Sequence, residues 1–142
     1  MSLETDLETL LAAAAPLGGL AEDEASARSE GKWSKKEILG HLIDSAGNNL
    51  QRFVRLQQTA TLNFPGYDQT SCVTIQRYQE RSWKDLFELW LALNRNIAHV
   101  VKNIAPTALA STWRTKDGDL TLEFLVKDYA SHMRHHLTQL GV

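Results

Sequence analysis

A chain of 142 residues can bury enough apolar surface for one ordinary domain, and we expect residues 1–142 to form a single domain. Its 43% hydrophobic and 23% charged residues exclude an intrinsically disordered chain. The 15 basic and 17 acidic side chains give a net charge of -2, without the basic block that nucleic-acid binding needs.

The first predicted helix begins near Thr5, because Thr5 and Glu8 have the spacing of a capping box. Its apolar period ends at Pro16, which cannot continue a helix interior. The polar stretch 21–32 has no sustained apolar period, so we expect a loop there with at most one helical turn.

The second predicted helix has the clearest start, because Ser34 and Glu37 again have capping-box spacing and an apolar period follows them. That period extends to about Thr59. The segment 61–81 contains the turn signal Pro65-Gly66 and is long for a simple connection, so we expect an ordered loop that contributes to function.

Two further helices are predicted over residues 82–104 and 120–140, each with apolar residues at helical spacing. A loop with Trp113 and the turn pair Asp117-Gly118 separates them. Four amphipathic helices without strand-like alternation favour an all-α four-helix bundle.

The five histidines differ in their helical phase. His136 lies roughly 40° and His132 about 80° from the centre of the last apolar stripe, one turn apart on one face. This spacing suits two ligands of one metal ion, and it equally suits two hydrogen-bonded core histidines. His99 and His135 point toward solvent, and His41 lies about 140° from the apolar direction of its helix, so periodicity does not select it.

Cys72 is the single cysteine, which excludes an internal disulfide, and the N-terminus lacks the pattern of a secretory signal. No apolar run approaches the roughly 20 residues that cross a bilayer. We therefore expect a cytoplasmic protein that binds neither membranes nor nucleic acid.

Three motifs resemble the DinB/YfiT-like superfamily. KWSKKEILGHLIDS, residues 32–45, resembles the second-helix signature of that family, and YASHMRHHLTQL, residues 129–140, resembles its closing motif. FPGYDQ, residues 64–69, resembles the loop after the second helix in the YfiT-like branch.

The resemblance implies a four-helix bundle that is commonly a homodimer and binds a divalent metal ion. By position in these motifs, the implied ligands are His41, His132 and His136. Nickel or zinc is the expected metal, and iron, manganese and copper also suit imidazole ligands.

An open coordination position beside neutral imidazoles makes a bound water or thiol more acidic. We therefore expect a small-molecule substrate and either a metal-dependent hydrolase or a transferase of a low-molecular-weight thiol, as in members of the family. The alternative is a non-catalytic binding or stress-response module that the metal stabilises.

Asp44 and Asp68 are the candidate catalytic residues. Asp44 follows His41 by three residues and suits a general base or a partner that orients a histidine, or else an exposed carboxylate on a helix. Asp68 and the neighbouring Tyr67 can reach a site from the long loop, although turn chemistry also explains an aspartate there.

The other polar and aromatic residues have simpler explanations. Arginines 52, 55 and 134 suit a substrate carboxylate, with solvated surface as the favoured explanation. The four tryptophans are expected to pack in the core or an interface. Cys72 has no activating neighbour in the sequence, and Gln139 is expected to support a helix end.

Overall fold

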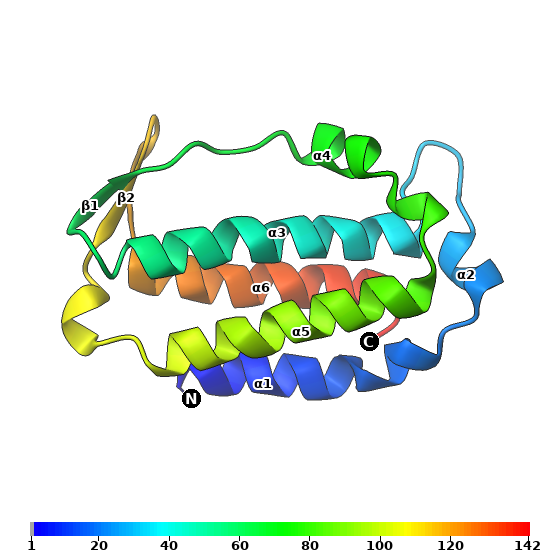
Figure 1. Cartoon of the computed structure of the whole chain (residues 1–142), viewed down its shortest axis with the longest axis horizontal. Coiled ribbons are helices and arrows are strands. Elements are labelled where there is room, and N and C mark those ends of the chain that lie inside the picture. Colours follow the sequence, from blue (N-terminus) through cyan, green and yellow to red (C-terminus); the bar gives the residue numbers. More distant parts are fainter. Residues whose placement is uncertain (1) are drawn as a thin grey trace.

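The computed structural model describes residues 2–142, and four long helices run along its longest axis (Figure 1). They are α1 (Leu3–Ala14), α3 (Lys35–Arg55), α5 (Trp83–Lys102) and α6 (Leu122–Leu140). The shorter elements are 3-10 turns at Ala15–Gly19, Tyr78–Glu80 and Pro106–Ala108, the helices α2 (Glu22–Ser26) and α4 (Gln69–Gln76), and the strands β1 (Thr61–Asn63), β2 (Thr112–Thr115) and β3 (Gly118–Thr121).

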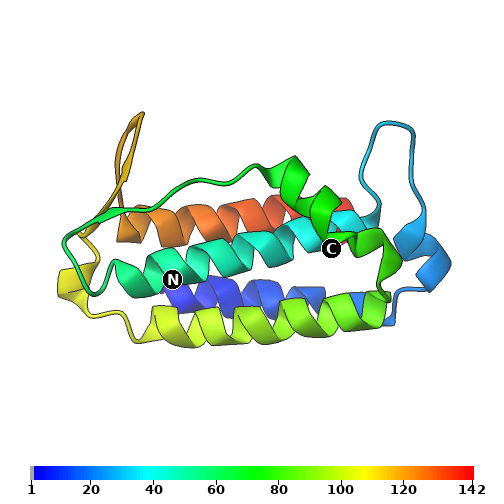
Figure 2. The same ribbon diagram turned by 45° about the horizontal axis from the view of Figure 1, so that its top comes forward.

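The four long helices form a bundle in which α1 and α3 each pack mainly against α5 and α6. Helices α1 and α3 therefore lie on one diagonal and α5 and α6 on the other, an arrangement visible in Figure 2. The prediction of a four-helix bundle is confirmed. Within residues 2–142, no helix is both long enough and apolar enough to cross a membrane.

The core is built from the apolar stripes that the helical period predicts. Its largest fully buried side chains come from all four long helices and from the residue that caps the end of α3: Leu7, Leu39, Phe53, Leu56, Trp83, Leu86, Trp90, Ile97, Leu122, Met133, Leu137 and Leu140. Trp83 and Trp90 are core residues as expected, and the Trp83 indole N–H donates to the Leu17 carbonyl at 2.6 Å. Trp33 and Trp113 are only half-buried.

Helix α3 begins where its capping box predicts. The Glu37 backbone N–H donates to Ser34 Oγ at 3.2 Å, and the Glu37 carboxylate accepts from the Ser34 backbone N–H at 3.0 Å. The predicted start of the first helix at Thr5 is wrong, because α1 begins at Leu3. The predicted end of the second helix at Thr59 is also wrong, because the helix ends at Arg55 before the chain enters β1.

A three-stranded sheet lies at one end of the bundle, so the expectation of an all-α chain is wrong in this part. β1 pairs in parallel with β2, and β2 pairs antiparallel with β3. Strands of three or four residues are too short to show a period of two, so the sequence pattern did not predict them.

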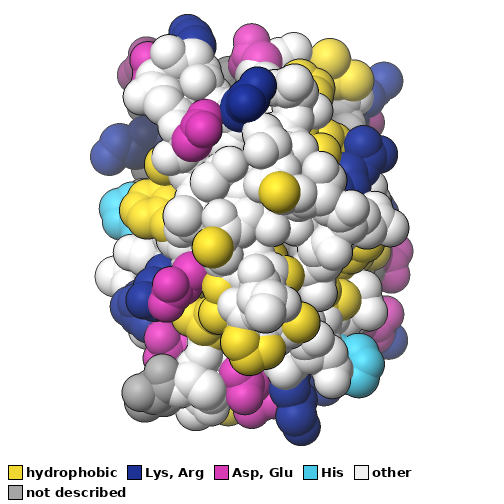
Figure 3. All heavy atoms as spheres, turned by 90° about the vertical axis from the view of Figure 1, so that its left-hand side faces the viewer, with side chains coloured by type: hydrophobic (Ala, Val, Ile, Leu, Met, Phe, Trp, Pro, Cys, Tyr) yellow, Lys and Arg dark blue, Asp and Glu magenta, His cyan; other side chains and the backbone are white. Residues whose placement is uncertain are grey.

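The last helix begins after the predicted start at about Leu120. Leu120 pairs in β3, and Thr121 caps α6 by accepting a hydrogen bond from the Phe124 N–H. Figure 3 looks onto this end, where charged side chains lie mostly around the rim.

The long segment 61–81 is ordered but is not a simple loop. It contains β1, then α4, which packs on α3. Figure 2 shows this segment passing over the outer side of α3. Helix α3 is therefore covered on a second side, away from the bundle core.

Candidate metal centre

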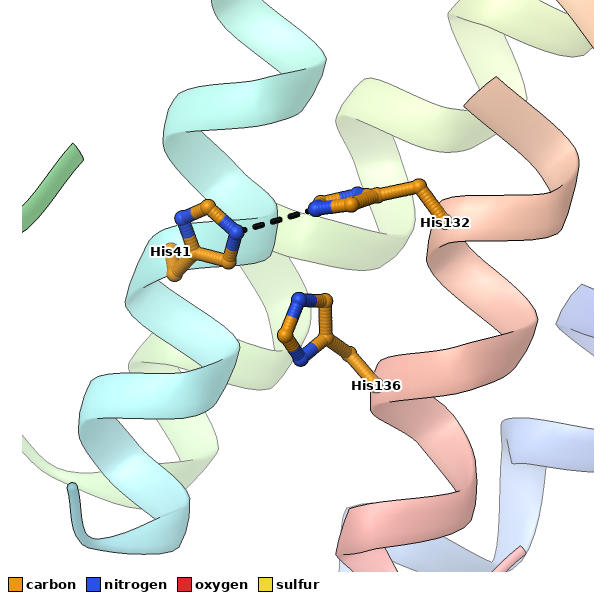
Figure 4. A group of neighbouring side chains, drawn as sticks. All are labelled: His41, His132 and His136. Atoms are coloured by element: carbon orange, nitrogen blue, oxygen red, sulfur yellow. Dashed lines mark hydrogen bonds between the residues drawn. The ribbon is translucent and has the colours of Figure 1, made fainter. Parts of the chain in front are cut away.

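Three imidazoles meet between α3 and α6, which pack directly against each other. His41 comes from α3, and His132 and His136 come from successive turns of α6. In Figure 4 all three rings point into the space between the two helices. Residues four apart on a helix lie on one face, so the predicted pairing of His132 and His136 follows from their spacing.

The burial of His41 explains why its helical phase is misleading. Every residue of the run 41–46 is buried, because one side of α3 faces the bundle core and another faces α6 and α4. His41 is only 1% exposed, although it lies far from the apolar stripe of α3. A projection of one helix finds a single mean apolar direction and cannot separate two buried faces.

The distances between the three rings are close to those of ligands that share one ion. One ligand nitrogen from each ring lies within 4.8 Å of the other two, and His41 Nε2 is 3.1 Å from His132 Nε2. Two nitrogens at about 2.1 Å from one ion are about 3.0 to 3.4 Å apart for bond angles of about 90 to 109°. The separation of His41 Nε2 from His132 Nε2 has this value, whereas the limit of 4.8 Å for the whole set is longer than one ion can span, so rotation of a ring is needed to complete the site. Three imidazoles are a donor set that suits a divalent transition metal.

Burial keeps the imidazoles in the form that binds metal. Desolvation, followed by the nearby His132 and His136, lowers the pKa of His41 to about 4. Desolvation and the neighbouring His136 also lower the pKa of His132, although Asp128 opposes this shift. Both rings are therefore neutral at pH 7, and a neutral imidazole has the lone pair that a metal ligand needs.

Gln139 holds the third ring in place. Its Oε1 lies 2.8 Å from His136 Nδ1, so this nitrogen donates and the neutral ring keeps its lone pair on Nε2. Gln139 was expected only to support the helix end, and this contact was not predicted. The spacing of three residues from His136 is the signal that identifies it. Trp33 packs beside His41 with 5.3 Å between the ring centroids.

Asp44 is buried, so the expectation of an exposed helix carboxylate is wrong. Its Oδ1 accepts from the Tyr78 hydroxyl and from Gln76 Nε2, both at 2.6 Å, and burial raises its pKa. It does not orient His41, whose Nδ1 has no hydrogen-bond partner within residues 2–142. Tyr78 reaches Asp44 by packing on Gly40, where an added Cβ would lie 2.1 Å from the tyrosine ring.

Asp68 is exposed and caps α4, with its Oδ1 accepting from the Ser71 N–H at 3.0 Å. Turn chemistry therefore accounts for this residue. Tyr67, its neighbour, is half-buried and lines a cavity of about 280 Å³ that also reaches His132. Within residues 2–142, Asp68 forms no hydrogen bond with any of the three histidines.

Arg52 lines the same cavity, and its assignment to the solvated surface is wrong. It is 6% exposed, and its guanidinium carbon lies 4.1 Å from the centre of the Trp113 ring. A cation against an aromatic face is a favourable contact, and β2 brings Trp113 to this position. Arg55 and Arg134 are exposed, as are His99 and His135, which agrees with the sequence analysis.

Comparison with known proteins supports the architecture. The family model of the DinB superfamily matches residues 2–140. The solved structure of YfiT from Bacillus subtilis, described as a probable metal-dependent hydrolase with an unusual four-helix bundle topology, superposes with a TM-score of 0.84. The two chains share 18% sequence identity, and the match covers 96% of this chain and 80% of YfiT. No curated protein matches the sequence significantly.

Proposed function

This chain belongs to the DinB superfamily, and from that premise we propose that it is a metal-dependent hydrolase whose divalent ion is held by His41, His132 and His136. The observation that carries the proposal is the convergence of three imidazole nitrogens within 4.8 Å of one another from two helices. The description of YfiT as a probable metal-dependent hydrolase is consistent with it.

The chain's own residues prepare this site. His41 and His132 are neutral at pH 7 because burial lowers the pKa of each, so no proton has to leave them before an ion binds. Gln139 sets the tautomer of His136. When bound, a divalent ion on three neutral ligands supplies Lewis acidity that lowers the pKa of a water at the remaining position.

Substrate reaches the site through the cavity that His132 shares with Tyr67 and Arg52. Its volume of about 280 Å³ is at the lower end for small-molecule sites, which favours a small substrate. Asp44, three residues after His41 on α3, is the carboxylate that we retain as the candidate general base, and burial raises the pKa of its carboxyl group. Asp68 caps α4, and we propose no catalytic role for it.

The test is hydrolysis of a panel of small esters and amides by the purified protein. We expect turnover that a chelator abolishes and that zinc or nickel restores, and no restoration in His136→Ala. His99→Ala is the matched control, because His99 is exposed on α5 and should leave turnover unchanged.

Two results would contradict the proposal. Consumption of an electrophile only with an added low-molecular-weight thiol would assign the site to a thiol transferase. Tight metal binding with no turnover of any substrate in either assay would assign it to a non-catalytic module.

A further inference from the structure

Arg52 is a buried cation without a counter-ion. It is 6% exposed, yet no carboxylate oxygen within residues 2–142 lies within 4.0 Å of its nitrogens. Within the part of the chain that the structure describes, its buried Nε has no hydrogen-bond partner, and the guanidinium makes one long hydrogen bond of 3.4 Å to Asn49. Buried charges in proteins are ordinarily paired because desolvation of an unpaired ion is costly.

Two aromatic rings lie beside the Arg52 guanidinium. Its central carbon is 4.1 Å from the centre of the Trp113 ring and 5.7 Å from the centre of the Phe64 ring. Stacking occupies the faces of a guanidinium and leaves the N–H edge to hydrogen-bond in its plane. A planar carboxylate matches that edge with two parallel hydrogen bonds.

The cavity that Arg52 lines also contains His132 of the proposed metal centre. Apolar atoms of Trp113, Leu120 and Leu125 form part of its wall. Asp128 also lines the cavity without pairing with Arg52, and its negative charge repels a multiply charged anion such as phosphate more strongly than a singly charged carboxylate. The cavity therefore combines Arg52, which can bind one negative charge, with an apolar wall and with His132 of the proposed metal centre.

We infer that Arg52 is a specificity-determining residue that binds the carboxylate of a small substrate and directs its scissile ester or amide group toward His132. The class of substrate is then a small carboxylic acid that carries a hydrolysable bond at its other end. This inference rests on the proposed hydrolase function for the scissile group, whereas the carboxylate site itself requires only Arg52 and the cavity.

The binding test uses the metal-free protein, so that no probe can coordinate an ion. The probes are 4-fluorobenzoate and its neutral counterpart 4-fluorobenzamide, observed by fluorine NMR. We expect the wild-type protein to bind the benzoate at least about tenfold more tightly, as one charge-assisted pair provides. Arg52→Met should lose this preference, and Arg55→Met, which changes an exposed arginine one turn later, should keep it.

Equal affinities of the wild-type protein for the two probes would overturn the inference, whether or not Arg52→Met folds. Survival of the preference in a folded Arg52→Met, or its equal loss in Arg55→Met, would also overturn it. Arg52→Lys keeps the charge but not the planar fork, so it should fold and bind the benzoate more weakly than the wild-type protein.

Activity separates this inference from the proposed function. In the metal-loaded protein, monomethyl succinate should have a KM at least about tenfold below that of dimethyl succinate, and Arg52→Met should remove the difference while metal binding persists. A benzoate preference without hydrolysis of either ester would remove the hydrolase and keep the carboxylate site. Hydrolysis without any charge preference would keep the hydrolase and remove the role of Arg52.

Discussion

The buried polar pair that joins α5 to α6 has its hydrogen bonds, whereas several buried polar atoms on α3 have no partner within residues 2–142. Asn94 on α5 donates to the Trp90 carbonyl and accepts from the Tyr129 hydroxyl of α6. In contrast, α3 contributes three of the four buried side-chain polar atoms without a partner in residues 2–142: His41 Nδ1, Asp44 Oδ2 and Arg52 Nε. The fourth is the Trp90 indole nitrogen.

The difference separates residues that specify the core from residues that serve a ligand. A satisfied pair such as Asn94 and Tyr129 fixes how two helices align, because any other alignment leaves both groups buried and unpaired. Unpaired groups cost stability, and proteins keep them where function requires them. Under the proposed function, the side of α3 that carries His41, Asp44 and Arg52 is the ligand-binding side of this bundle.

The largest expected effect is that of His41→Leu on metal binding. Loss of one of three ligands should weaken zinc binding by more than about 1000-fold, roughly 4 kcal/mol, in a competition titration against a chromophoric chelator. The metal-free variant should be as stable as the wild-type protein or more stable, because removal of the buried, unpaired Nδ1 offsets loss of the hydrogen bond between His41 Nε2 and His132 Nε2. His135→Leu, an exposed neighbour on α6, is the control, and equal metal affinity in both variants would contradict the site.

Tyr129→Phe tests the paired side of the comparison. It leaves the Asn94 side-chain oxygen buried without its donor, so the free energy of unfolding in urea should fall by about 1 to 3 kcal/mol. Metal affinity should stay unchanged, because within residues 2–142 neither residue hydrogen-bonds to the three histidines. The double variant with Asn94→Leu should recover part of the loss; no loss in the single variant would show that this pair does not specify the core.

Acidification should destabilise the metal-free protein through His41. Its folded pKa of about 4 is below the unfolded value of about 6.5, so the unfolded chain binds more protons between these values. The contribution of His41 to stability is therefore complete above pH 6.5 and falls as the pH falls to about 4. Screening by nearby solvent reduces the loss to about 1 to 2 kcal/mol. Urea unfolding of the wild-type protein and of His41→Leu across this pH range isolates the contribution of His41. The same pH dependence of the free energy of unfolding in both proteins would contradict the prediction.

Gln139→Ala should have the smallest effect. Loss of the acceptor for His136 Nδ1 frees the ring to change tautomer, which should weaken zinc binding by about 10-fold, roughly 1.4 kcal/mol. Gln139→Glu keeps an acceptor and should bind at least as tightly as the wild-type protein. An unchanged affinity in Gln139→Ala would limit this residue to the helix end.

Much of the fold could be predicted from local patterns. Apolar residues at helical spacing locate all four long helices, and the Ser34–Glu37 capping box locates the start of α3 to the residue. The three short strands could not be predicted, because β1 pairs with β2 some 50 residues later in the chain and neither strand is long enough to alternate. The expected homodimer and cytoplasmic location stay predictions.

The sequence by itself determined which helices form and that His132 and His136 share a face, because helical period and spacing are properties of one segment. Only the tertiary structure decided that His41 faces that pair, that Asp44 and Arg52 are buried, and that Arg52 has no counter-ion among residues 2–142. The physical reason is that burial on the second face of α3 depends on α4, α6 and β2, which contact α3 or its side chains only after the chain folds.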